Sequence, residues 1–239
     1  MKLRIYEDVQ QLSEAAAHAF IEEARKAIRE SGRFTVALAG GSTPKRTYET
    51  LAAGYGGTED LDWGRVHFFF GDERNVPPDD DDSNYRMAHE ALLSYVPAGS
   101  VHRMRGELEP SEAAALYEQE LEEFFGGAPR FDLILLGIGE DGHTASLFPR
   151  TPALEVSDRF VIENPVEKLD SIRITLTVPA INAARKVVFL VAGESKAQAL
   201  REILKRDAEP QEYPAKLIQP AGELVWMVEA AAANSLNSP

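Results

Sequence analysis

The sequence contains no cysteine, no long apolar run and little positive charge. Without cysteine, its 239 residues cannot form disulfides, thiolate metal sites or a thiol nucleophile, which fits a cytoplasmic protein. No apolar run approaches the ~20 residues that cross a bilayer, and we expect no signal peptide because strand-like sequence follows Met1 directly. The formal net charge of −14 disfavours nucleic acid and anionic membranes as partners.

The rest of the composition is typical of a globular protein. Hydrophobic residues make up 44% and charged residues 27% of the sequence. A chain of this length can bury a substantial core, so we predict one α/β domain over residues 1–239. The negative net charge leaves room for a small anionic ligand, provided that positive charge gathers in one cleft.

Short apolar runs alternate with segments of helical spacing along the whole chain. Strands are predicted at residues 3–6, 34–39, 65–70, 101–105, 131–136, 160–162, 171–177, 186–192 and 224–228. Helices are predicted at residues 9–29, 45–51, 84–95, 110–125 and 197–204, and residues 230–239 are expected to be frayed. The alternation predicts an α/β fold with an open, mainly parallel sheet and helices on both faces.

The segment 131–143 is the centre of this pattern. Residues 131–136 form an apolar run without period-two alternation, which is typical of a strand covered on both faces. Ligands bind where such strands end. Here the end carries glycines together with Glu140, Asp141 and His143, the titratable groups of the loop. We therefore predict that His143 is catalytic, with a solvated histidine in a structural turn as the alternative.

The glycines of this loop also match the dinucleotide fingerprint G-x-G-x-x-G. That fingerprint requires a long helix that opens at its third glycine. Pro149 and Pro152 leave room for barely one turn after Gly142. We therefore reject a dinucleotide site and expect no cofactor.

The loop after residues 34–39 has the features of a phosphate site. Gly40 and Gly41 allow close approach of the backbone, Ser42 or Thr43 can cap the following helix, and Pro44 suits its first position. Free N–H groups at a helix N-terminus bind phosphate well. We favour a phosphate site over a plain strand-to-helix turn.

Two further strands end in charged residues. Asp72 and Glu73 can serve as acid or base and Arg74 can clamp an anion, although an ion-paired loop is the alternative. Lys196 stands in the first turn of a helix, where the helix dipole disfavours a lysine, so a functional role is favoured over a solvated one. His18 and His67 are interpreted as surface or packing residues.

The carboxyl ends of parallel strands lie along one edge of a sheet, so these segments can meet. A phosphate site, cationic side chains and a histidine beside Asp141 suit a small phosphorylated substrate and acid–base chemistry without metal or cofactor.

Three motifs in this order resemble the 6-phosphogluconolactonase family, and the match covers almost the whole chain. They are LAGGSTP at 38–44, FGDER at 70–74 and GIGEDGHTASLFP at 137–149. The resemblance implies a Rossmann-like fold, shared with glucosamine-6-phosphate deaminase. It also implies hydrolysis of 6-phosphoglucono-δ-lactone in the oxidative pentose phosphate pathway. We expect a cytoplasmic protein that is a monomer or a small homo-oligomer.

The resemblance also implies roles for single residues. His143 would be the general base that activates water, Asp141 would orient the imidazole or hold substrate hydroxyls, and Arg74 would pair with the phosphate or the developing oxyanion. The residues implied to bind the substrate or its phosphate are Gly40, Gly41, Ser42, Thr43, Asp72, Arg173 and Lys196.

Two alternatives remain open, a deaminase-like isomerase and a non-catalytic sugar-phosphate sensor. Deaminases resemble one another in continuing the histidine loop as Gly-His-Ile-Ala-Phe-Asn-Glu-Pro, with a glutamate that works beside the histidine. Phe148 occupies that place here and cannot carry a proton. A sensor would need only the phosphate site, so the intact Asp141–His143 loop favours an enzyme, and the missing carboxylate favours hydrolysis.

Overall fold

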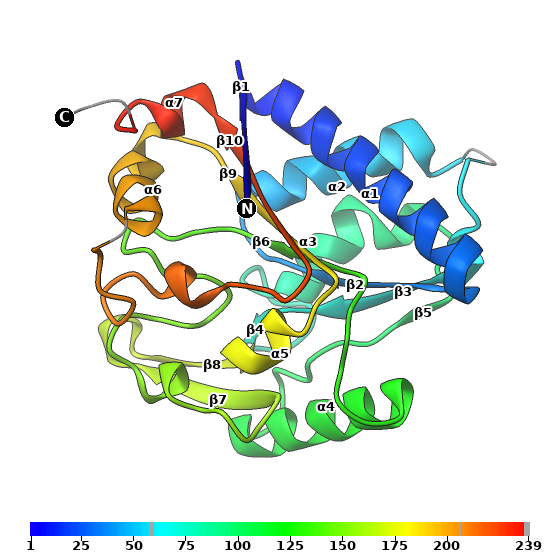
Figure 1. The fold of residues 1–239 in the computed structure, drawn as a ribbon. Coiled ribbons are helices and arrows are strands. Elements are labelled where there is room, and N and C mark those ends of the chain that lie inside the picture. Colours follow the sequence, from blue (N-terminus) through cyan, green and yellow to red (C-terminus); the bar gives the residue numbers. More distant parts are fainter. Residues whose placement is uncertain (58–59, 206, 237–239) are drawn as a thin grey trace.

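Seven parallel strands form the central sheet of the computed structural model, which describes residues 1–57, 60–205 and 207–236 (Figure 1). In spatial order they are β1 (Lys2–Tyr6), β10 (Glu223–Glu229), β9 (Lys186–Val191), β6 (Leu133–Leu136), β2 (Phe34–Leu38), β3 (Val66–Phe70) and β5 (Ser100–Val101). β6 is flanked by β9 and β2, so the prediction of a central parallel strand at residues 131–136 is confirmed. All its residues are buried, because both faces of the sheet are covered.

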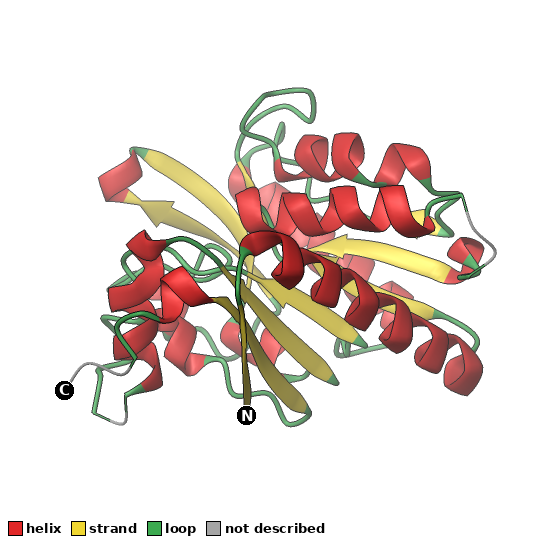
Figure 2. Cartoon of the chain, turned by 90° about the horizontal axis from the view of Figure 1, so that it is seen from above, coloured by secondary structure: helices red, strands yellow, loops and turns green. Residues whose placement is uncertain are grey.

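Helices cover both faces of this sheet, as predicted. One face packs on α1 (Val9–Ser31), α2 (Ser42–Tyr55) and α3 (Asn84–Ala91). The other face packs on α4 (Pro110–Phe125), α5 (Val178–Asn182), α6 (Ala197–Leu204) and α7 (Ala230–Ala233). Figure 2 shows the twisted strands with long helices laid along one face. Alternate side chains of each strand thus enter two separate cores.

Local sequence sets the ends of the longest helix. The side chain of Asp8 caps α1 by accepting a hydrogen bond from the backbone N–H of Gln11 at 2.8 Å. Gly32 ends it in the left-handed region, with φ of 79°. The predicted helix at residues 9–29 is therefore confirmed.

None of the helices in the described residues is long and apolar enough to cross a membrane.

A second, antiparallel sheet lies beside the first and was not predicted. Its strands are β4 (Asp72–Arg74), β8 (Ser171–Leu176) and β7 (Val161–Val166), in that order. Residues 71–75 were predicted only as the charged end of the strand at 65–70, and the strands at 160–162 and 171–177 were predicted without assigned partners. The two predicted strands are present as β7 and β8, and the short turn that joins them makes an antiparallel pair. Residues 72–74 add a third strand to this pair through β8.

Three smaller predictions also need correction. The strand predicted at 101–105 is only Ser100–Val101, and beyond it the backbone N–H of His102 still donates to the carbonyl of Phe68 in β3, at 2.8 Å. The helix predicted at 84–95 ends at Ala91 and is followed by a separate 3-10 turn. At the C-terminus, α7 buries Ala232 and Ala233 against the core, so this part is not frayed; residues 237–239 lie outside the described residues.

Candidate active site

A cavity of about 520 Å³ opens at the carboxyl edge of the central sheet, between the loops that follow the neighbouring strands β2 and β6. From β2 the chain continues outward to β3 on one side, whereas β6 lies on the other side. In α/β proteins such a switch point creates the crevice in which ligands bind. The cavity size lies in the usual range for small-molecule sites.

Most of the predicted site residues line this cavity. They are Gly40, Gly41, Asp72, Arg74, Asp141, His143, Arg173 and Lys196. Ser42 and Thr43 are not among its lining residues and instead open α2. These residues come from five separate segments of the chain, and four of those segments were predicted to meet from the positions of the strand ends.

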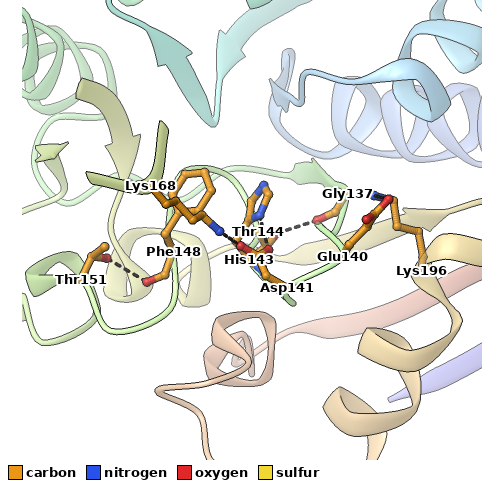
Figure 3. Close-up of polar contacts among 9 residues, drawn as sticks. All are labelled: Gly137, Glu140, Asp141, His143, Thr144, Phe148, Thr151, Lys168 and Lys196. Carbon is orange, nitrogen blue, oxygen red and sulfur yellow. Dashed lines mark hydrogen bonds and ion pairs between the residues drawn. The ribbon is translucent and has the colours of Figure 1, made fainter. Parts of the chain in front are cut away.

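The loop after β6 wraps tightly around His143 (Figure 3). The backbone N–H of Gly139 donates to the carbonyl of His143 at 2.8 Å, and the hydroxyl of Thr144 donates to the carbonyl of Gly137 at 2.8 Å. Gly139 is required here by space, because a Cβ at this position would lie 2.0 Å from Nδ1 of His143. The histidine is therefore positioned by its own loop.

Asp141 determines which nitrogen of His143 is free. Its Oδ1 lies 2.5 Å from Nδ1 of His143 and 3.2 Å from the backbone N of the same residue. An ionised carboxylate only accepts, so Nδ1 carries the proton and Nε2 keeps its lone pair. Phe148 stacks on the imidazole with ring centroids 4.1 Å apart.

Burial lowers the pKa of His143 to about 4. The Asp72 carboxylate opposes this change, and the positive charges of Lys196, Arg173 and Arg74 reinforce it. The imidazole is therefore neutral at pH 7, as a proton acceptor must be.

Positive charge gathers on one wall of the cavity. Arg74 of β4 and Arg173 of β8 are directly paired in the antiparallel register. Burial, and then the charge of Arg74, lower the pKa of Arg173. Its Nε is buried without a hydrogen-bond partner in the described residues. Two like charges on facing strand positions repel each other, so this wall is suited to an anion.

Lys196 adds a third cation from the turn before α6. Its Nζ lies 3.8 Å from Oε1 of Glu140, a loose ion pair between two residues that line the cavity (Figure 3). The ammonium is therefore free enough to pair with an incoming anion.

The two carboxylates after β3 have different roles. Asp72 is buried and lines the cavity, and its Oδ2 accepts a hydrogen bond from the hydroxyl of Ser146 at 2.7 Å. Glu73 points away and accepts from the backbone N–H groups of Asn84 and Tyr85 at 2.7 and 2.8 Å. The predicted acid–base role of Glu73 is thus wrong, because it does not line the cavity and its carboxylate holds the first backbone N–H groups of α3, whose N-cap is Ser83.

The glycine loop after β2 also differs from the prediction. Gly41, with φ of 99°, is the N-cap of α2, so neither Ser42 nor Thr43 caps that helix. Gly40 has no room for a side chain, because a Cβ there would lie 1.9 Å from Oδ1 of Asn84. Backbone rather than side chains therefore faces the cavity at this point.

Sequence reasoning missed several cavity residues, of which Lys168 is the most informative. Lys168 comes from the turn between β7 and β8, and its Nζ forms an ion pair with Oδ2 of Asp141. A charged residue between two strands is typical of a solvent-exposed turn, so the sequence around Lys168 carries no signal of a functional role. Asn84 and Ser146 likewise line the cavity through long-range packing.

His18 and His67 lie outside the cavity, as expected. His18 is exposed on α1. His67 packs on the ring of Phe124 and its Nδ1 lies 2.7 Å from the hydroxyl of Ser100. Within the described residues, no group of three or more His, Cys, Asp or Glu side chains is placed to hold a metal ion.

Comparison with known proteins places this architecture in one family. Residues 7–226 match the model of glucosamine-6-phosphate isomerases/6-phosphogluconolactonase. The 6-phosphogluconolactonase of Synechocystis is 50% identical over 218 residues, 88% of each chain, and that of Nostoc is 47% identical over the same shares.

Solved structures agree. The 6-phosphogluconolactonase from Trypanosoma brucei superposes with a TM-score of 0.87 at 30% identity, over 98% of each chain. A monomeric glucosamine-6-phosphate deaminase, 23% identical with a TM-score of 0.82 over 98% of this chain and 100% of its own, shares the fold. The chain therefore belongs to the family of glucosamine-6-phosphate isomerases and 6-phosphogluconolactonases.

Proposed function

We propose that this protein hydrolyses 6-phospho-D-glucono-1,5-lactone to 6-phospho-D-gluconate. The observation that carries the proposal is a neutral imidazole whose Nε2 is free beside a cavity with a cationic wall. Its relatives at 50% and 47% identity bear the name 6-phosphogluconolactonase. A metabolite that carries both a phosphate and an electrophilic carbonyl matches both features of the cavity.

His143 is the general base of the proposed reaction. Its Nε2 removes a proton from water as the water oxygen bonds to C1 of the lactone. The carbonyl electron pair moves to the carbonyl oxygen, where a cationic side chain stabilises it. When the intermediate collapses, the C1–O5 bond breaks and the ring oxygen takes the proton from the imidazolium. The product is an open-chain hydroxy acid that ionises at neutral pH.

The proposed phosphate site lies between the loop that contains Gly40 and Gly41 and the cationic side chains of the cavity. Backbone N–H groups of Ser42 and Thr43 precede the first intrahelical bond of α2, from Lys45 N to the Gly41 carbonyl at 3.1 Å, so helix geometry leaves them without an acceptor. Gly40 and Gly41 let a phosphate approach them. Arg74, Arg173 and Lys196 supply the balancing charge.

Phe148 separates this proposal from deaminase chemistry. The position that holds a glutamate in the deaminase loop pattern carries an apolar ring stacked on His143. Deamination needs several proton transfers through ring opening, whereas hydrolysis needs one base. Asp72 is held by Ser146 and is proposed to bind substrate hydroxyls.

The test uses purified protein and freshly generated lactone, with acid release compared to buffer alone. We expect enzymatic acceleration without added metal, and no ammonia from glucosamine 6-phosphate. Ammonia release at enzymatic rates with lactone decay no faster than buffer would instead assign a deaminase. Binding of 6-phosphogluconate without turnover of either substrate would assign a sensor.

A further inference from the structure

Lys168 reaches the His143 loop from a different sheet. It lies in the 3-10 turn Glu167–Leu169 that joins β7 to β8. Asp170 closes this turn in the left-handed region, with φ of 45°, and donates its backbone N–H to the carbonyl of Glu167 at 3.0 Å. The turn thereby presents one ammonium at the cavity wall, on the side of Asp141 and Phe148 (Figure 3).

Two contacts connect this ammonium to the imidazole. The Nζ of Lys168 pairs with Oδ2 of Asp141, whose other oxygen holds Nδ1 of His143. The same Nζ lies 4.8 Å from the ring centroid of Phe148, and this ring stacks on the imidazole of His143. Both neighbours that orient His143 are therefore themselves held by Lys168.

The ion pair also changes the electrostatics of the base. An unpaired carboxylate at 2.5 Å from Nδ1 would strongly stabilise an imidazolium and raise the pKa of His143. The other charged groups facing His143 are Asp72 and Arg74 of β4, Arg173 of β8, and Lys196 before α6. Lys168 supplies the counter-charge that Asp141 would otherwise lack.

We propose that Lys168 is a positioning residue for His143: it fixes the carboxylate of Asp141 and offsets part of its charge, so that the imidazole keeps its Nδ1 proton directed at Asp141 and its Nε2 directed at the substrate. The kinetic part of this inference rests on the proposed hydrolysis, whereas the coupling of the three side chains does not. Lys168 itself takes no part in proton transfer.

The test compares Lys168→Met, which keeps the side-chain length without the charge, with Lys168→Arg, which restores it. Lys205→Met is the matched control, because Lys205 is similarly exposed and pairs with Glu202 on α6, away from the cavity. Two quantities are measured for each variant. They are the steady-state constants for the lactone, and the pKa of His143 from an NMR titration without substrate, assigned with His143→Asn.

For Lys168→Met we expect kcat to fall about tenfold with KM changed less than about threefold. The pKa of His143 should rise by about 1 pH unit, because Asp141 loses its counter-charge. Lys168→Arg should restore most of kcat and bring the pKa of His143 most of the way back, and Lys205→Met should match the unmodified protein in both quantities.

Either of two results would overturn the proposal. An unchanged His143 pKa in Lys168→Met would show that the ammonium is not coupled to the base. A rise in KM alone, of tenfold or more, would mean that Lys168 contacts the substrate instead. If the unmodified protein does not accelerate lactone decay, the proposed function fails, and the NMR titration still decides the coupling.

Discussion

At the scale of single residues, the surroundings of His143 decide whether its imidazole is protonated at neutral pH. A histidine in water is half protonated near pH 6.5. Burial lowers the pKa of His143 to about 4, and the carboxylate of Asp141 holds the Nδ1 proton. A bound phosphate dianion would offset the three nearby cations and raise this pKa, so binding itself improves the base.

Replacing His143 by Asn should lower kcat by ~10²–10⁴, because the water loses its proton acceptor, while KM changes little. His18→Asn is the control, since His18 is exposed on α1. Steady-state assays on freshly generated lactone measure both constants. Near-normal kcat in His143→Asn would contradict the assignment of the base.

At the scale of elements, the site is built from loops that follow rigid strands. β6 is central in the parallel sheet and carries the base, whereas β4 and β8 carry the two paired arginines in the small sheet. Asn84 belongs to α3, which packs on the central sheet, and its Nδ2 donates to the carbonyl of Asp72 in the small sheet at 2.9 Å. The position of His143 relative to the two arginines therefore depends on how the small sheet packs beside the central sheet.

Gly139→Ala tests the packing of the catalytic loop. The new Cβ would lie 2.0 Å from Nδ1 of His143 and 2.5 Å from Oδ1 of Asp141, so one of these groups must move. We expect a loss of kcat of ~10² or more with the fold intact, because a displacement of about 1 Å is costly in an active site.

Gly54→Ala is the matched control for this substitution. Gly54 lies in α2, and a Cβ there meets nothing within 4 Å. Activity should be unchanged, and the free energy of unfolding should stay equal or rise by ~0.5–1 kcal/mol, since Ala favours helix over Gly. Equal kcat values for Gly139→Ala and the control would refute the tight-loop interpretation.

At the scale of the whole molecule, the pKa of His143 couples the site to folding. The group is neutral in the native state down to a pH of about 4, whereas it binds a proton below about 6.5 when unfolded. Between these values the unfolded state binds more protons, so the free energy of unfolding falls as the pH falls.

This coupling predicts the pH dependence of stability. From pH 7 to pH 4.5, His143 should contribute a loss of about 2–3 kcal/mol in the free energy of unfolding. His143→Asn lacks this contribution and should show a correspondingly smaller loss. Urea denaturation at both pH values measures the difference, and parallel losses for the two proteins would contradict the predicted burial effect.

Much of the fold was predictable because its signals are local. The apolar runs, the Asp8 cap and Gly32 mark buried strands and a helix wherever they occur. The pairing of β4 with β8 was not predictable, since residues 72–74 meet residues 173–175 only across about a hundred positions of chain. The same reason hid Lys168 from the site, and it left Glu73 with a false catalytic role.

The sequence by itself determined the buried central strand, the loop at residues 137–143 that ends in His143 and the family to which the chain belongs, because these depend on neighbouring residues. The tertiary structure alone decided the facing of Arg74 with Arg173, the pairing of Lys168 with Asp141 and the low pKa of His143. Charge and burial act through space, and only the folded chain brings these distant side chains within a few ångströms of one another.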